Sequence, residues 1–258
     1  MKQQDEAITR ALAAAEKIAD QYLKLDTENI DKKRIAELLT EALAVVELCE
    51  QVLGINHPGT MELYYEIGSM YDYAKDYPRA VEWYTKAAEH GHDDAQCSLA
   101  LSHHLGKGVK KNPAKAIEWY TKAAEKENEI ALFELGEIYQ YGQGVEVNHA
   151  KAAEWYTKAA EKGDELAYRE VACCLYTIEE YDKALSWAEK AVKEYPEDHF
   201  GIYYLASIYQ ALGRKEEALS QFELCLKLEE EQQAGNEMID DEMINETKDR
   251  IRELKNED

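Results

Sequence analysis

The string Trp-Tyr-Thr-Lys-Ala-Ala-Glu occurs three times in the chain, starting at Trp83, Trp119 and Trp155, so the interval is 36 residues each time. Seven identical residues at one fixed interval do not arise by chance, and a period of roughly 20–50 residues is typical of repeat proteins. The sequence therefore predicts an array of similar units, each of which completes its core only by stacking on its neighbours.

Two small residues mark each unit of the array. The first precedes a bulky residue by three positions, as in Gly68 with Tyr71 and Gly136 with Tyr139. The second follows 12 or 16 residues later and is an alanine in five units: Ala80, Ala116, Ala152, Ala184 and Ala218. Small residues at such points let two helices approach closely. Each unit is therefore predicted to be a helix A, a turn and a helix B.

The two middle units have a longer turn that contains the pattern Gly-x-Gly-Val, at residues 106–109 and 142–145. Glycine adopts backbone angles that end a helix. In the first of these turns, Asn112 is suited to an N-cap and Pro113 to the first helical position. Neither turn completes a phosphate-binding or dinucleotide-binding pattern, and no predicted strand precedes them. The glycines thus indicate a turn between helices.

These units resemble two related families of helical repeat. The shorter units are similar to tetratricopeptide repeats, and the longer ones resemble the Sel-one-like repeat. The resemblance implies an all-α fold, a right-handed α-solenoid of antiparallel helix pairs. It divides the chain into an irregular N-terminal helix pair (1–56), a tetratricopeptide-like repeat (57–94), two Sel-one-like repeats (95–164), two tetratricopeptide repeats (165–232) and an acidic C-terminal capping helix (233–258).

Charge and composition exclude several classes of function. The chain has 53 acidic and 30 basic residues, for a net charge of −23, so phosphate backbones and anionic lipid surfaces would repel it. We therefore expect no nucleic-acid or membrane partner. No signal peptide and no run of 18 apolar residues is present, which favours a cytoplasmic location. The five cysteines form no Cys-x-x-Cys pair, so we expect reduced residues on helices and no metal or cofactor.

The resemblance also implies where a partner would bind. In tetratricopeptide arrays, certain helix A positions line a concave groove. The matching residues here are Tyr65, Ser69, Asp72, Tyr73, Leu101, His104, Phe133, Glu137, Gln140, Tyr141, Arg169, Tyr176, Tyr203, Ser207 and Gln210. Tyrosine and phenylalanine offer a large contact area at low entropy cost, and the acids beside them favour a neutral to basic segment. With only Arg169 positive, an acidic chaperone tail is not expected to bind.

The main hypothesis is a non-enzymatic scaffold that binds a protein or peptide partner in this groove, with no catalytic residues. One alternative uses the histidines at His90, His92, His103 and His104 for a metal-dependent or hydrolytic function. Another is a structural protein that assembles with itself. The sequence leaves the oligomeric state open.

Overall fold

The computed structural model describes residues 2–24, 32–234 and 241–256, and within them all regular structure is helical. The helices are α1 (Lys2–Leu23), α2 (Lys32–Val52), α3 (Pro58–Tyr73), α4 (Tyr77–Glu89), α5 (Asp93–Leu105), α6 (Pro113–Ala124), α7 (Glu129–Tyr141), α8 (His149–Glu161), α9 (Leu166–Thr177), α10 (Tyr181–Glu194), α11 (His199–Ala211), α12 (Lys215–Ala234) and α13 (Asp241–Asn256). They form two units, Met1–Ala131 (unit 1) and Leu132–Asp258 (unit 2), and α7 begins in the first and continues in the second. The all-α prediction is confirmed.

Unit 1 begins with the two longest helices of the chain, α1 and α2, at 22 and 21 residues. They correspond to the predicted irregular N-terminal pair. Ile18 of α1 and Ala42 of α2 are at most 1% exposed. They belong to one hydrophobic core that continues through Leu63 and Ile67 of α3. The first pair is thus packed into the same core as the first regular repeat.

The repeated tyrosine and the small residue of helix A meet in both units. A Cβ atom added to Gly68 would lie 2.6 Å from the ring of Tyr84, and one added to Gly136 would lie 2.5 Å from the ring of Tyr156. Real Cβ atoms do not approach other atoms so closely, so glycine is what allows the tyrosine of helix B to cross helix A here. This contact explains why the small residue of helix A and the tyrosine of helix B recur together in the sequence.

The long turn after α5 is built as the sequence predicts. Gly106 has a φ of 78° and ends α5, while the Asn112 side chain accepts a hydrogen bond from the Lys115 amide at 3.1 Å and starts α6. Gly108 has a φ of 72°, and an added Cβ would lie 2.3 Å from the carbonyl oxygen of Tyr77, at the start of α4. The turn therefore packs directly on the helix B of the preceding repeat, where only glycine fits.

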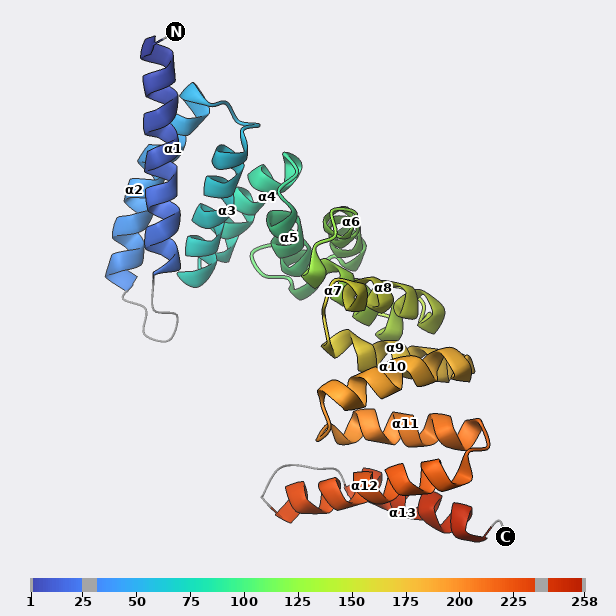
Figure 1. The fold of residues 1–258 in the computed structure, drawn as a ribbon. Helices are drawn as coiled ribbons and strands as arrows, with labels where there is room; N and C mark the ends of the chain where they lie inside the picture. The colour runs from blue at the N-terminus through green and yellow to red at the C-terminus, as the bar shows by residue number, and fades with distance from the viewer. Residues whose placement is uncertain (1, 25–31, 235–240, 257–258) are drawn as a thin grey trace. The chain divides into compact units, whose positions relative to one another are not determined.

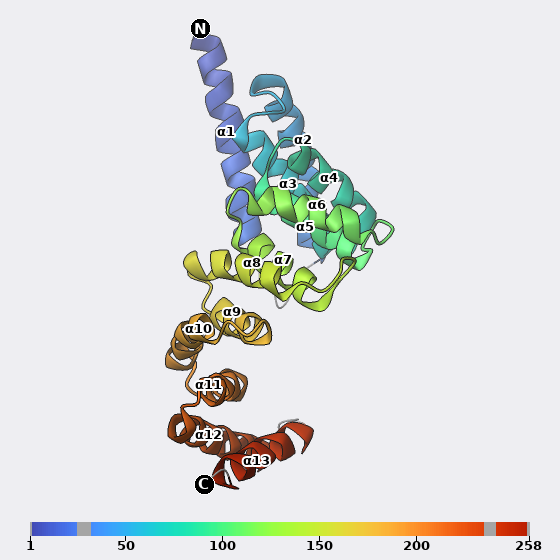
Figure 2. The ribbon, with the colours of Figure 1, turned by 90° about the vertical axis from the view of Figure 1, so that its right-hand side faces the viewer.

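In unit 2, helices α8 to α13 lie in successive layers, which is the stacking expected of an α-solenoid (Figure 1, Figure 2). The last helix, α13, packs on α12 through Ile251 and Leu254, which are 8% and 2% exposed. It falls inside the segment predicted to cap the array. Met238, which the sequence also assigns to that helix, lies outside the described residues.

Candidate protein-binding surface

The structure places every residue predicted for the groove on a helix A. On α3 are Tyr65, Ser69, Asp72 and Tyr73; on α5 are Leu101 and His104; on α7 are Phe133, Glu137, Gln140 and Tyr141; on α9 are Arg169 and Tyr176; on α11 are Tyr203, Ser207 and Gln210. Because the two units are separate bodies, we describe the helix A surface of each unit by itself.

In unit 1 the surface has an aromatic floor. The ring of Tyr65 stacks on His92, with centroids 4.9 Å apart, and lies 5.9 Å from the ring of Tyr84. The Ser69 hydroxyl donates to the Tyr65 carbonyl at 3.0 Å and accepts from the Tyr84 hydroxyl at 3.4 Å. Burial is the main cause that raises the pKa of Tyr65, so the phenol stays neutral at physiological pH. Ser69 and Tyr65 are thus held in fixed positions.

Tyr22 of α1 joins this floor, although it is not among the predicted groove residues. Its pKa is raised by burial and then by the nearby Tyr65, Tyr73 and Asp72, while a hydrogen bond with Ser69 lowers it. Tyr22 stands three residues after Ala19 on α1, where helix A of a repeat has its bulky residue. The groove positions were taken from the regular repeats alone, and α1 lies outside them.

The open part of the unit 1 surface is apolar. Tyr73 is 38% exposed, Leu101 is 39% exposed and Leu105 is 51% exposed, while His104 is half-buried. Large apolar side chains left in contact with water on one surface are a feature of binding sites. Leu105, at the last groove position of its helix A, is the most exposed of these side chains.

His90 and His92 of unit 1 cap the ends of helices. The Nδ1 atom of His92 accepts the Ala95 amide at 3.3 Å at the start of α5, and its Nε2 atom lies 3.0 Å from Glu62. His90 is the C-cap of α4, and burial lowers the pKa of His103. Among the residues that the structure describes, no three His, Cys, Asp or Glu side chains gather as metal ligands would. Nothing in this region favours the metal-dependent alternative.

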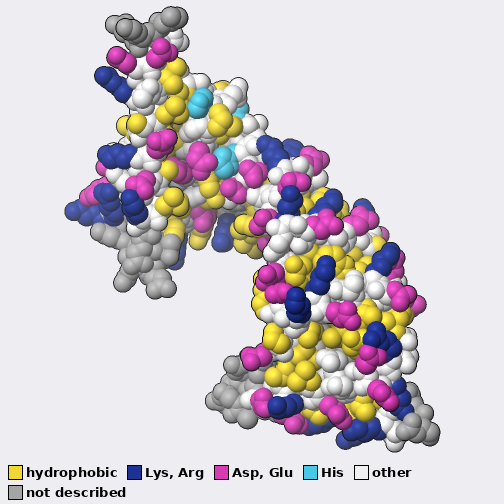
Figure 3. Space-filling view, in the orientation of Figure 1, with side chains coloured by type: hydrophobic (Ala, Val, Ile, Leu, Met, Phe, Trp, Pro, Cys, Tyr) yellow, Lys and Arg dark blue, Asp and Glu magenta, His cyan; other side chains and the backbone are white. Residues whose placement is uncertain are grey.

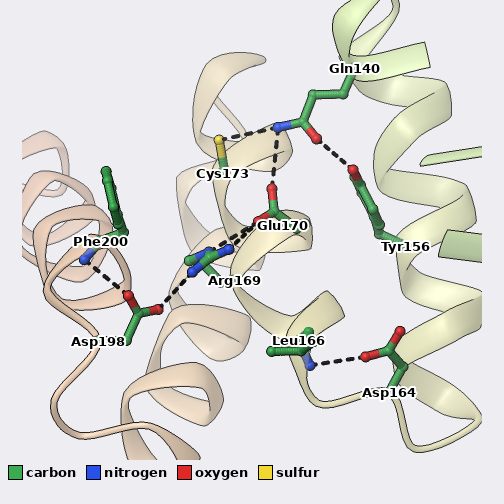
Figure 4. A network of polar contacts seen from close by, with 9 residues as sticks. All are labelled: Gln140, Tyr156, Asp164, Leu166, Arg169, Glu170, Cys173, Asp198 and Phe200. Atoms are coloured by element: carbon green, nitrogen blue, oxygen red, sulfur yellow. Dashed lines mark hydrogen bonds and ion pairs between the residues drawn. The ribbon is translucent and has the colours of Figure 1, made fainter. Parts of the chain in front are cut away.

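In unit 2 the one predicted cation of the groove is already paired (Figure 4). The Arg169 guanidinium donates to Glu170 at 2.8 and 3.0 Å and to Asp198 at 3.1 Å. Two carboxylates around one guanidinium leave a net negative charge at this point. A partner carboxylate would therefore have to displace an existing ion pair.

Gln140 links three helices of unit 2 in the same network. Its side-chain oxygen accepts the Tyr156 hydroxyl at 2.6 Å, and its Nε2 donates to Glu170 at 3.3 Å (Figure 4). Only 8% of Gln140 is exposed, and Ser207 on α11 is 3% exposed. These two predicted residues lie beneath the surface, where they can position other side chains.

Carboxylates cluster around Glu137 on α7. Burial raises the pKa of Glu137, and so do the charges of Glu134 and Glu170, neither of which was in the predicted set. Burial raises the pKa of the neighbouring Tyr141, with Glu170 as the second cause, yet Tyr141 is 60% exposed. An exposed aromatic ring beside mutually repelling carboxylates is the main chemical feature of this surface.

Aromatic side chains continue the surface of unit 2 toward α13. The ring of Tyr204 lies 6.2 Å from Tyr176 and 6.1 Å from Tyr203, so it joins two predicted residues although it was not itself predicted. The Tyr203 hydroxyl donates to Glu246 of α13 at 2.5 Å. Figure 3 shows hydrophobic patches bordered by charged side chains over the helices of unit 2, on the face that it presents.

Comparison with protein families matches most of the repeat region. The Sel1 repeat model matches residues 93–128, 130–164 and 176–194, and tetratricopeptide models match residues 30–90 and 202–232. The chain is a hybrid of tetratricopeptide and Sel1 repeats. The third Sel1 match lies in the segment 165–232, for which the sequence predicts two tetratricopeptide repeats. In this hybrid array, the Sel1 matches thus extend to residue 194 and lie between the two tetratricopeptide matches.

Solved structures share the fold of the hybrid array. A Sel1 repeat protein from Oxalobacter formigenes is 28% identical, with a TM-score of 0.57, over 76% of this chain and 85% of that one. The protective antigen c5321 of uropathogenic Escherichia coli, with an SLR fold, is 22% identical over 93% of this chain and 56% of that one, with a TM-score of 0.57. YrrB, a TPR protein with an unusual peptide-binding site, is 19% identical over 64% of this chain and 84% of that one, with a TM-score of 0.52. A search of curated proteins gave no match.

Repeats of these two families indicate a protein–protein interaction scaffold, and such repeat proteins are generally not enzymes. Among the described helices, none combines the length and the apolar character needed to cross a bilayer.

Proposed function

We propose that the helix A surface of the hybrid array binds a neutral to basic segment of a protein partner, with the strongest attraction in unit 2. The observation that carries this proposal is the carboxylate cluster of Glu134, Glu137 and Glu170. Burial raises the pKa of Glu137, and repulsion from Glu134 and then Glu170 raises it further. A lysine or arginine from a partner would relieve that repulsion, which makes binding of a cation favourable at this point.

The aromatic side chains beside the cluster would supply the contact area. Tyr141 is 60% exposed, and Tyr176 is half-buried against Tyr204. Tyrosines held by their neighbours lose little conformational entropy when a partner packs on them. A segment that alternates basic and apolar residues would match this arrangement.

The paired state of Arg169 supports the proposal that acidic tails are not ligands. Its guanidinium is shared between Glu170 and Asp198, so no unpaired positive charge is offered at this predicted position. The net charge of −23 would further slow the approach of an acidic segment.

The test is selection of peptides from a random phage-displayed library on the whole protein. The wild-type protein is expected to enrich peptides with net positive charge and aromatic or aliphatic residues. A Glu137→Gln, Glu170→Gln double variant is expected to lose the preference for basic peptides.

The matched control is the Glu161→Gln, Asp182→Asn variant, which removes two charges from exposed positions on α8 and α10. It should select the same peptides as the wild-type protein. Equal selection by all three proteins would show that the carboxylate cluster does not recognise the partner.

A further inference from the structure

One position of helix B carries a small side chain in a single repeat and a large aliphatic one in the others. The residue after the small alanine of helix B is Val81, Ile117, Leu185 and Leu219 in four repeats, but Ala153 in the second Sel1 repeat. A large aliphatic side chain is therefore missing from α8 at a place where the other repeats have one. The pattern of the repeat itself gives no reason for this loss.

The structure shows a groove where that side chain is missing. It lies within unit 2 between α8, the end of α9 and α10, is open to solvent, and has a volume of about 680 Å³. Its apolar wall is formed by Ala150 and Ala153 of α8, Leu175 and Ile178 at the end of α9, and Trp187 of α10. Sites that receive small molecules or bulky side chains are typically concave, mostly apolar and about 300–1,000 Å³ in volume. This groove is mostly apolar and has a volume in that range, and its lining shares no residue with the helix A surface.

The rim of the groove carries balanced charges, two acidic and two basic. Glu154, Lys158, Glu180 and Lys183 stand on it. Lys183 forms an ion pair with Glu180, and the Lys158 ammonium lies 4.0 Å from the centre of the Trp155 ring. A charged occupant would find little opposite charge to interact with here, whereas an uncharged apolar group needs no such partner.

We infer that this α8–α10 groove receives a bulky apolar side chain from a neutral segment of a protein partner. The balanced rim distinguishes this occupant from the basic segment proposed for the helix A surface. A second copy of the chain is a poorer fit, because two chains of net charge −23 repel each other. The inference does not depend on the proposed function of helix A.

The experiment uses the whole protein with its four tryptophans replaced by 5-fluorotryptophan, so that each gives a separate fluorine NMR signal. The probe is N-acetyl-tryptophanamide, a neutral compound with a bulky apolar side chain, and the charged comparison is N-acetyl-lysinamide. The Trp187 signal is assigned with Trp187→Phe. We expect the neutral probe to shift the Trp187 signal and leave the signals of Trp83 and Trp119 unchanged.

Two variants should abolish that shift. Ala153→Ile restores the residue type of the preceding repeat and fills the groove. Ala150→Glu puts a charge at its mouth, on an exposed position in the first turn of α8, where an acid is compatible with the helix. Ala114→Glu, at the matching exposed position of α6, is the control and should leave the shift unchanged.

Four outcomes would overturn the inference. They are equal shifts at all tryptophan signals, a shift that persists in both groove variants, a response to the lysine probe instead, and a Trp187 signal that changes with protein concentration alone. The last would identify a second copy as the occupant. Because none of these variants alters helix A, peptide selection by the helix A surface is a separate result.

Discussion

The helix A surfaces of the two units are built from the same repeat positions but differ in charge. In unit 1, Asp72 stands among Tyr22, Tyr65 and Tyr73, and the exposed side chains are apolar. In unit 2 the same helix face carries a carboxylate cluster around Glu137 and a guanidinium that is already paired. The repeat frame therefore fixes where side chains stand, and the individual residues decide what each unit attracts.

The largest expected effect tests whether the cores of the two units depend on the same contact. Gly68→Ala in unit 1 and Gly136→Ala in unit 2 would each force a Cβ within 2.6 Å of a buried tyrosine ring. We expect each to lower the free energy of unfolding by about 3 kcal/mol, as overpacking does. Urea denaturation measures the loss, and hydrogen exchange shows which unit opens.

Gly213→Ala is the matched control, because its Cβ would meet no atom within 4 Å although its φ is 72°. Its cost should come only from the backbone and be about 1 kcal/mol. If Gly136→Ala cost no more than this control, close helix approach would not be what the glycine provides.

A buried acid makes the stability of unit 1 depend on pH. Burial, with the charge of Glu62 as the second cause, raises the pKa of Glu66 to about 8. The folded state then binds a proton that the unfolded state releases near the ordinary glutamate pKa of 4.5, so stability falls as the pH rises from about 4.5 to about 8. Glu66→Gln should lessen this decline and add about 2 kcal/mol at pH 8, within the range that linkage allows.

The measurement is urea denaturation of both proteins across that pH range. Glu37→Gln, at an exposed position of α2, is the control and should keep the wild-type pH dependence. A parallel pH dependence in the wild-type protein and Glu66→Gln would contradict the assignment of the decline to Glu66.

The contrast in surface charge predicts different effects on binding. For a basic peptide selected on the wild-type protein, Glu137→Gln with Glu170→Gln should weaken affinity about tenfold, or ~1.4 kcal/mol, mostly through a slower association rate at low salt. Asp72→Asn in unit 1 should weaken it far less. Association rates measured at increasing salt would converge for the three proteins. An equal effect of Asp72→Asn would mean that unit 1 contributes as much to the charge preference.

The smallest expected loss of stability concerns the N-cap that follows each of the two long turns. The side chains of Asn112 in unit 1 and Asn148 in unit 2 accept hydrogen bonds from the Lys115 and Lys151 amides at 3.1 and 2.9 Å. Asn112→Ala and Asn148→Ala should each cost about 1 kcal/mol in thermal or urea unfolding, and replacement by serine should restore most of it. Unequal losses would show that one turn is held by other contacts.

Repeat spacing predicted the elements well because it is a local property. The positions of Gly68 and Ala80, the capping role of Asn112 and the helical termination at Gly106 all follow from residues near one another in the chain. The five cysteines also lie on helices, as expected.

The partners of individual side chains were not predictable in the same way. The repeat frame put Gln140 and Ser207 among the groove residues, and they prove to be buried beneath the surface. It omitted Tyr22, Glu170 and Tyr204, which stand between the frame positions or outside the regular repeats. Burial and like-charge repulsion depend on neighbours from other helices, which spacing along one helix does not reveal.

The sequence by itself determined that this is a helical repeat array, because identical residues at a constant interval permit only units that stack in the same way. Only the tertiary structure decided that Arg169 is paired, that Glu66 is buried and that the loss of one aliphatic side chain at Ala153 adjoins a groove. The physical reason is distance. Helix formation depends on residues within a few turns, whereas charge pairing, burial and cavities depend on side chains about 30 residues apart in the chain that stacking brings together.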